Sequence, residues 1–218
     1  SISSFHIDNY KGAIKIDVRD ADAAPRYCGL RITGVKVKPS PKHIQHRLKA
    51  IGLKPINNIV DATNYVLHEM GQPLHAFDGE KINTGVVRVQ KLEEGTTFVT
   101  LDRIERKLSS EDLVICNGDT PMCLAGVFGG LDSGVTEKTT EIFLESAYFD
   151  PVCIRKTAKR HGLSTDASFR YERGIDIELV KYSLRRAAIL IQEVAGGAVS
   201  SEIIEEYPNK QKPHQVVL

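Results

Sequence analysis

Hydrophobic residues recur at helical spacing in four parts of the chain. The first part begins at Ser40 and Pro41, a favourable N-cap followed by a favourable first helical residue. Gly52 is a favourable end for the same helix. The apolar residues that share one helical face between these limits are Ile44, Leu48 and Ile51. We therefore predict an amphipathic helix that begins after Ser40 and ends near Gly52.

Three further helices follow from the same pattern. One covers 58–70 and stops at a glycine, and another runs from Asp150 and Pro151 to about Arg160. The longest covers 176–195 and ends before a pair of glycines. Its apolar stripe consists of Ile177, Val180, Leu184, Ala187, Ile191 and Val194. Such a stripe is typical of a helix that packs one face on a core.

Short β-type runs occupy the middle of the chain. Residues 27–38 are rich in β-branched residues around Gly34, where a bulge is expected. Between 85 and 147, five runs are bounded by Gly, Asp or Pro: VVRVQ, TTFVTL, LVICNG, CLAGVF and EIFLESA. A last strand is expected over 198–207. Because helices cluster at both ends and strands in the middle, this order predicts an α+β fold.

The two ends of the chain are polar and carry no strong periodicity. We interpret 1–25 as an N-terminal connector with one strand and 208–218 as a C-terminal linker. The intervening 26–207 form the domain, and a chain of 218 residues is long enough for a sizeable core. The sequence does not begin with Met, so we expect a piece of a longer protein.

Composition and charge narrow the possible functions. Hydrophobic residues make up 41% of the chain and charged residues 26%, as in ordinary soluble globular proteins. No apolar run reaches the length of a membrane span, and the start lacks a signal-peptide pattern. We therefore expect a cytoplasmic protein. The formal net charge is +1, whereas stand-alone nucleic-acid binders are usually much more basic.

Cysteine spacing argues against disulfides and zinc. Cys28, Cys116, Cys123 and Cys153 form no C-x-x-C pair. We expect free, partly buried thiols in a reducing compartment. Neither the cysteines nor the histidines show the paired spacing of a tetrahedral site, so no metal is predicted. The glycine-rich segments match neither of the common nucleotide-phosphate motifs.

Polar residues interrupt the predicted helix over 58–70 and the segment after it. Thr63 and Asn64 fall in the middle of the helix, where their side chains compete with backbone hydrogen bonding. His75 follows a Gly-Gln-Pro-Leu turn, so we place it on a loop, where binding residues often lie. The structural alternative for the Thr–Asn pair is a local hydrogen bond. For His75 it is a surface position or a ring whose hydrogen bonds the protein satisfies.

Two later segments, 124–139 and 143–149, contain glycines with accessible main chain and a single carboxylate within an apolar run. In 124–139, Gly126 and Gly129 would let a substrate approach the main chain, although a tight turn explains them equally well. Glu145 interrupts the apolar run FLESAYF over 143–149. If its carboxylate points inward it needs a hydrogen-bond donor, such as a ligand hydroxyl. The alternative is an outward position on an edge strand.

The segment 159–176 combines small polar residues with basic ones. Thr165 and Ala167 would leave room for a ligand. The three arginines expected to contact RNA phosphate or to form ion pairs are Arg160, Arg170 and Arg173. A solvated charged face is the structural alternative. From the residues alone, these segments indicate a soluble α+β domain with a candidate cleft.

Taken together, these segments resemble the central region of the bacterial phenylalanyl-tRNA synthetase beta subunit. The matching stretches are NNIVDATNYVLHEMGQPLHAFD, LAGVFGG followed by SGV, FLESAYFDP and HGLSTDASFRYERGID, in the same order and with similar spacing. The resemblance covers about 20–205. It implies the editing-module fold of that family, an α+β fold with mixed or antiparallel central sheets flanked by helices.

The resemblance also implies an activity, post-transfer editing, in which tyrosine wrongly attached to tRNA(Phe) is hydrolysed. The substrate-binding residues that it implies are Thr63, Glu145, Gly126, Gly129 and Ala167. The residues that it implies for positioning the water or the terminal adenosine are His75, Asn64 and Thr165. No cofactor is expected in this region, because the family's synthetic site, which uses ATP and magnesium, lies in the alpha subunit. The implied partners are the tyrosine-carrying acceptor end of tRNA(Phe) and the alpha subunit of a two-alpha, two-beta tetramer.

The chemistry gives each group a testable role. We expect Glu145 to accept a hydrogen bond from the phenol hydroxyl, and a backbone N–H of the Gly126–Gly129 loop to donate to the same oxygen. His75 is a candidate general base. Three other functions stay open: a non-catalytic module that positions tRNA or subunits, a stand-alone deacylase, and a generic ligand-binding domain.

Overall fold

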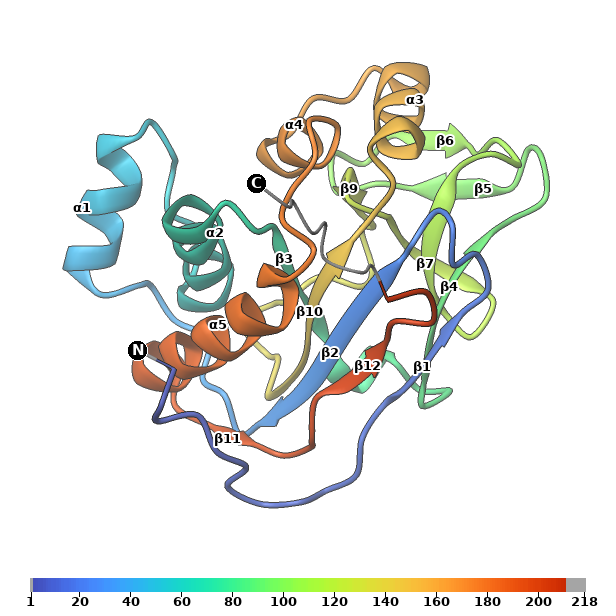
Figure 1. Ribbon diagram of the computed structural model, residues 1–218. Coiled ribbons are helices and arrows are strands. Elements are labelled where there is room, and N and C mark those ends of the chain that lie inside the picture. Colours follow the sequence, from blue (N-terminus) through green and yellow to red (C-terminus); the bar gives the residue numbers. More distant parts are fainter. Residues whose placement is uncertain (1, 211–218) are drawn as a thin grey trace, which may run out of the picture.

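The computed structural model describes residues 2–210 and contains two five-stranded sheets (Figure 1). The central sheet has the order β11 (Ala198–Val199), β2 (Arg26–Thr33), β10 (Glu141–Tyr148) and β3 (Leu74–Asp78), with β12 (Ile204–Glu206) also paired to β2. The outer sheet has the order β1 (Lys15–Val18), β4 (Val86–Lys91), β7 (Leu113–Asn117), β8 (Thr120–Leu124) and β9 (Phe128–Gly129). A separate hairpin joins β5 (Thr97–Val99) to β6 (Glu105–Lys107).

The chain also forms several helices, two of which cover one face of the central sheet. The helices are α1 (Lys42–Ala50), α2 (Asn58–Met70), α3 (Pro151–His161), α4 (Asp166–Tyr171), α5 (Leu179–Ala195) and the short 3-10 helix η1 (Gly79–Lys81). Figure 1 shows α2 and α5 on one side of β2 and β10, with β4 and β7 on the other side. The α+β prediction, with mixed and antiparallel sheets flanked by helices, is therefore confirmed. Among residues 2–210, no helix is long and apolar enough to span a membrane.

Two hydrophobic cores lie on the two faces of the central sheet. Along β10, Ile142 and Leu144 belong to the core beneath the helices, whereas Phe143 and Ala147 belong to the core between the sheets. Because side chains alternate along a strand, Glu145 lies on the same face as Phe143 and Ala147. Strand β10 pairs with β2 on one side and β3 on the other, so the edge-strand alternative for Glu145 is wrong.

The start of helix α1 differs from the prediction. Pro41 occupies the N-cap position without a side-chain cap, and the helix begins at Lys42. The hydroxyl of Ser40 instead donates to the buried carboxylate of Asp61 in α2. Ile51 lies past the last helical residue and is 52% exposed, so it does not belong to the packed face.

Other predicted elements are shorter or divided. Helix α5 begins at Leu179 rather than at 176, because a turn in which Leu179 N–H donates to the Asp176 carbonyl precedes it. The CLAGVF run is divided between β8 and β9 by a turn. The last strand is divided into β11 and β12, where the hydroxyl of Ser201 takes the hydrogen bond from Arg31 N–H.

The structure can be compared with the predicted connector, 1–25, and with the predicted linker, 208–218. Within the proposed connector, β1 pairs in parallel with β4 and so adds a strand to the outer sheet. The proposed linker, 208–218, lies mostly outside the described residues. The division into connector, domain and linker stays a prediction. All four cysteines are free thiols, and Cys28, Cys116 and Cys123 are buried.

Candidate functional site

A cavity of about 450 Å³ opens between α2, β3, β10, the glycine loop after β8 and the start of α4. Its lining includes all eight residues that the resemblance implied for substrate binding and catalysis: Thr63, Asn64, His75, Gly126, Gly129, Glu145, Thr165 and Ala167. These residues come from five separate parts of the chain, so the fold itself brings them together. Their individual roles stay predictions.

Helix α2 supplies the Thr–Asn pair on a rigid support. The side chain of Asn57 accepts hydrogen bonds from the N–H groups of Ile59 and Val60 and so caps the helix start. The hydroxyl of Thr63 donates to the carbonyl of Val60 at 2.8 Å, which leaves its lone pairs for a ligand. Asn64 is partly exposed and lines the cavity.

His75 lies in strand β3, so its predicted loop position is wrong. It pairs with Glu145 of β10 in antiparallel register, and its ring packs edge-on against Phe77 with centroids 4.4 Å apart. Its Nε2 atom is enclosed and has no hydrogen-bond partner among the described residues. Burial lowers the pKa of His75 to about 4. The imidazole is therefore neutral at pH 7.

Glu145 is the buried carboxyl group of the cavity, and only 4% of the residue is exposed. The hydroxyl of Tyr27, from β2, donates to its Oε2 at 2.7 Å. Burial raises the pKa of Glu145 to about 8, although the bond from Tyr27 opposes that shift. At pH 7 the carboxyl is therefore mainly neutral.

Sequence reasoning missed Tyr27 as a residue of the site. It required a donor for an inward-pointing Glu145 and assigned that part to a ligand, whereas the protein supplies a phenol hydroxyl. The two residues are 118 positions apart in the sequence. The pairing of β2 with β10 brings them together, and a lone aromatic residue in a strand carries no signal of it.

The glycine loop is shaped by close packing. Gly126 has a φ of 65°, and a Cβ atom at this position would lie 2.8 Å from Cδ2 of Tyr171. A Cβ atom at Gly129 would lie 3.0 Å from Cδ1 of Leu101 and 3.4 Å from Cε1 of His75. Gly126 therefore meets both a backbone and a space requirement for glycine, and Gly129 meets a space requirement.

Thr165 and Ala167 border the cavity at the start of α4. The hydroxyl of Thr165 accepts from Ser168 N–H at 3.0 Å and donates to the carbonyl of Val127 at 3.0 Å. Thr165 is thus the N-cap of α4 and fastens this helix to the glycine loop. Ala167 adds a small side chain to the cavity wall.

The remaining walls are largely apolar. The side chains that form them include Leu67, Leu101, Val127, Phe128, Val135 and Tyr171. The hydroxyl of Tyr171 donates to the carbonyl of Ala147 at 3.2 Å, so the ring faces the cavity with its polar group satisfied. An apolar enclosure with a single buried carboxyl suits a ring that carries one polar substituent.

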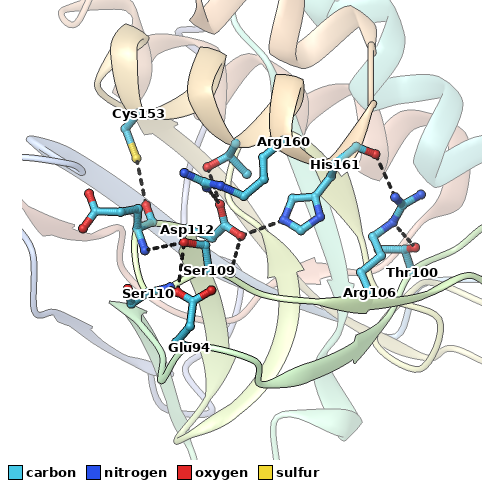
Figure 2. A network of polar contacts seen from close by, with 11 residues as sticks. Glu94, Thr100, Arg106, Ser109, Ser110, Asp112, Cys153, Arg160 and His161 are labelled. Atoms are coloured by element: carbon cyan, nitrogen blue, oxygen red, sulfur yellow. Dashed lines mark hydrogen bonds and ion pairs between the residues drawn. The ribbon is translucent and has the colours of Figure 1, made fainter.

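Arg160 lies outside the cavity lining and belongs to a network of polar contacts around the buried Asp112, shown in Figure 2. Asp112 is fully buried and pairs with Arg160, with His161 Nε2 at 2.6 Å and with the Thr157 hydroxyl at 3.0 Å. Burial alone would raise the pKa of Asp112, but the hydrogen bonds from His161, Ser109 N–H and Thr157 lower it. This arrangement uses Arg160 as a structural ion pair.

Arg170 and Arg173 line a smaller hollow of about 370 Å³ beside the cavity. Arg170 donates to the carbonyl of Asp166 at 2.8 Å and lies 3.1 Å from Nδ1 of His68. Arg173 lies over the ring of Phe169, 3.6 Å from its centroid, and the ring is half exposed. RNA contact by these arginines stays a prediction.

Metal binding finds no support in the arrangement of side chains. Within residues 2–210, no group of three or more His, Cys, Asp or Glu side chains lies close enough to hold a metal ion. The polar groups of the cavity instead include one imidazole, two carboxyls, two amides and two threonine hydroxyls, from His75, Glu145, Asp166, Asn57, Asn64, Thr63 and Thr165.

The sequence and the fold both match proteins of known kind. The phenylalanine–tRNA ligase beta subunit of Bacteroides fragilis is 58% identical over 203 residues, which are 93% of this chain and 25% of that protein. The corresponding subunit of Porphyromonas gingivalis is 60% identical over 207 residues, which are 94% of this chain and 25% of that protein. The chain thus spans about a quarter of the length of these relatives.

A solved structure shares the fold. An N-terminal fragment of the phenylalanyl-tRNA synthetase beta subunit from Pyrococcus horikoshii matches 92% of this chain and 56% of its own, with a TM-score of 0.59 at 12% identity. A family model described as the B3/4 domain matches residues 23–196. The chain therefore belongs to the B3/4 domain family.

Proposed function

We propose that this domain edits mischarged tRNA by hydrolysing the ester between tyrosine and the terminal ribose of tRNA(Phe). The observation that carries the proposal is Glu145, a nearly fully buried carboxyl in an otherwise apolar cavity. The names of its relatives place such a domain in a phenylalanine–tRNA ligase. The relevant error of that enzyme is tyrosine, which differs from phenylalanine by one hydroxyl.

In this proposal the cavity binds the tyrosine hydroxyl through a hydrogen bond. A pocket shaped for phenylalanine rejects tyrosine only weakly, by about a hundredfold in comparable cases. A site built to hydrogen-bond a substrate hydroxyl rejects the analogue that lacks it by about 10⁴–10⁵. With phenylalanine bound, the polar atom of Glu145 that faces the cavity would stay buried without a partner, which costs free energy.

Hydrolysis requires a water molecule held against the ester carbonyl. The water oxygen forms a bond to the carbonyl carbon, the bond to the ribose oxygen breaks, and a proton reaches that oxygen. His75 lines the cavity as a neutral imidazole and is our candidate to orient the water or to take its proton. We assign Asn64 to the water or the terminal adenosine and Thr63 to the bound substrate, since both line the cavity from α2.

Thr165 acts mainly by holding the wall in place, because its hydroxyl already bonds Ser168 and Val127. The proposal requires no cofactor in this domain; ATP and magnesium belong to the synthetic site of an alpha subunit. The partners that it implies are tRNA(Phe) and that alpha subunit, in a two-alpha, two-beta tetramer. We assign contact with the RNA backbone to Arg170 and Arg173, which line the smaller hollow.

The test is release of tyrosine from Tyr-tRNA(Phe) by the complete synthetase, with Phe-tRNA(Phe) as the control substrate. The proposal predicts release of tyrosine, little release of phenylalanine, and loss of tyrosine release in Glu145→Ala. If the folded complete enzyme released no tyrosine, the domain would be a non-catalytic module that positions tRNA or subunits.

A further inference from the structure

The two oxygens of the Glu145 carboxyl have different surroundings. Oε2 accepts the hydrogen bond from Tyr27 at 2.7 Å. Tyr27 is fully buried and is absent from the cavity lining, whereas Glu145 is part of it. Tyr27 therefore holds the carboxyl from behind, and Oε1 is the oxygen left for the cavity.

The groups around Glu145 supply no positive charge. The titratable side chains that face it are Tyr27 on β2, His75 on β3, Cys123 on β8 and Tyr171 on α4. Burial raises the pKa of both tyrosines and of the cysteine, and it lowers the pKa of His75, so all four are neutral at pH 7. No lysine or arginine forms an ion pair with Glu145 within residues 2–210.

We propose that Tyr27 is a positioning residue that sets the direction of the specificity hydrogen bond: with Oε2 occupied by the Tyr27 hydroxyl, Glu145 presents a protonated Oε1 to the cavity and donates to the phenol oxygen of the substrate. This inference rests on the proposed editing function and deepens it. It reverses the direction expected from the sequence, in which Glu145 accepts from the phenol.

The chemistry of a carboxylic acid supports this direction. The carbonyl oxygen of a neutral carboxyl is its better acceptor, so the Tyr27 hydroxyl pairs with a carbonyl Oε2 and leaves the hydroxyl on Oε1. A phenol oxygen offers lone pairs to that donor. Phenylalanine offers none, so the Oε1 hydroxyl would be left without an acceptor in a buried site.

The first experiment changes the phenol and leaves the protein unaltered. A fluorine beside the phenol hydroxyl makes its oxygen a weaker acceptor and its O–H a stronger donor. The complete synthetase is given tRNA(Phe) acylated with tyrosine or with 3-fluorotyrosine, at about pH 6, where both phenols are neutral. The inference predicts slower hydrolysis of the fluorinated ester, and faster hydrolysis would overturn it.

The second experiment separates donor from acceptor in Glu145. In Glu145→Gln the amide oxygen can accept from Tyr27 while the amide N–H₂ donates to the phenol. We expect Glu145→Gln to retain tyrosine release within about tenfold of the wild type, and Glu145→Ala to lose it. Equal loss in both variants, with the wild type active, would overturn the inference and leave the editing function intact. No release by the wild type would instead remove the editing function itself.

The third experiment tests Tyr27 through a pH profile. We expect tyrosine release by the wild type to fall as pH rises through the Glu145 pKa of about 8, and release by Glu145→Gln to show no such fall. The bond from Tyr27 lowers that pKa, so Tyr27→Phe should move the fall to higher pH and reduce the rate by about three- to tenfold.

The matched control is Tyr148→Phe, which removes a hydroxyl from the other face of β10, away from the cavity lining. It should leave both the rate and the pH profile of tyrosine release unchanged. A Tyr27→Phe profile that coincides with that of the wild type would overturn the positioning role.

Discussion

Two of the buried carboxyl groups in this domain are held in opposite states. Asp112 is fully buried and meets an arginine, a histidine, a threonine hydroxyl and a backbone N–H, and its pKa is lowered (Figure 2). Glu145 is 4% exposed and meets one protein hydroxyl, and its pKa is raised to about 8.

The difference between them lies in how many of their oxygens the protein itself satisfies. Asp112 has no capacity left for a ligand, because its partners satisfy both oxygens. Glu145 has one oxygen satisfied and borders a cavity. An incompletely satisfied buried carboxyl costs stability, and such a cost is typical of functional sites. Substitutions at these two carboxyls, at His75 and in the glycine loop test this contrast.

Removing the carboxyl of Asp112, which is the ionised one of the two, should have the largest effect on stability. In Asp112→Ala the buried side chain of His161 and the paired Arg160 lose their partner. We expect a loss of about 4 kcal/mol in the free energy of unfolding, measured by urea denaturation. The control is Asp119→Ala, because the Asp119 side chain is 80% exposed and its pair with Arg88 is a surface one. A loss below about 1 kcal/mol in Asp112→Ala would contradict the structural role.

Glu145 should make the domain less stable as pH rises. Its folded pKa of about 8 lies above the ordinary value of 4.5, so the folded state holds a proton that the unfolded state has released. Stability therefore falls between these two pH values, and the sign is opposite to that of a salt-bridged acid. Relative to Glu145→Gln, we expect the wild type to lose about 3 kcal/mol between pH 5 and pH 7.5. Parallel stability curves for the two proteins would show that Glu145 is ionised.

His75 should make the domain less stable as pH falls into the acid range. Its folded pKa of about 4 lies below the ordinary value of 6.5, so the unfolded state binds a proton first as pH falls. The stability due to neutral His75 is complete above about pH 6.5 and declines toward pH 4. We expect a loss of about 2 kcal/mol between pH 6.5 and pH 5 relative to His75→Gln. The exposed His43 is the control, and His43→Gln should follow the wild type.

The glycine loop should show the smallest effect. In Gly126→Ala the methyl group meets Tyr171, and the backbone keeps a positive φ. In Gly12→Ala the φ is also positive, at 91°, but nothing lies within 4 Å. We expect Gly126→Ala to cost about 1 kcal/mol more than Gly12→Ala in thermal unfolding, since only the former adds a clash. Equal costs would show that the loop can move away from Tyr171.

Local signals explain which elements the sequence predicted well. Helix α2 has the predicted bounds, because Asn57 caps its start and Gly71, with a φ of 76°, ends it. Helix α3 likewise begins after the N-cap Asp150. Helix α4 has six residues, which is too short for an apolar period to be visible, and it was not predicted.

Non-local contacts explain what the sequence left out. Strand β3 begins directly after Pro73 and exists because it pairs with β10, so His75 resembles a loop residue until that pairing is known. The partners of Arg160 and Glu145 lie 48 and 118 positions away. The family resemblance indicates which residues meet at the cavity, whereas periodicity alone does not show which distant segments lie together.

The most direct test compares the two carboxyl groups in one assay. The ratio of tyrosine to phenylalanine release from tRNA(Phe) is measured for the complete synthetase and for its Glu145→Ala and Asp112→Asn variants, at a temperature where all three are folded. The account predicts that Glu145→Ala abolishes the preference for tyrosine and that Asp112→Asn keeps it. A preference that survives Glu145→Ala would contradict the central claim that this carboxyl reads the substrate hydroxyl.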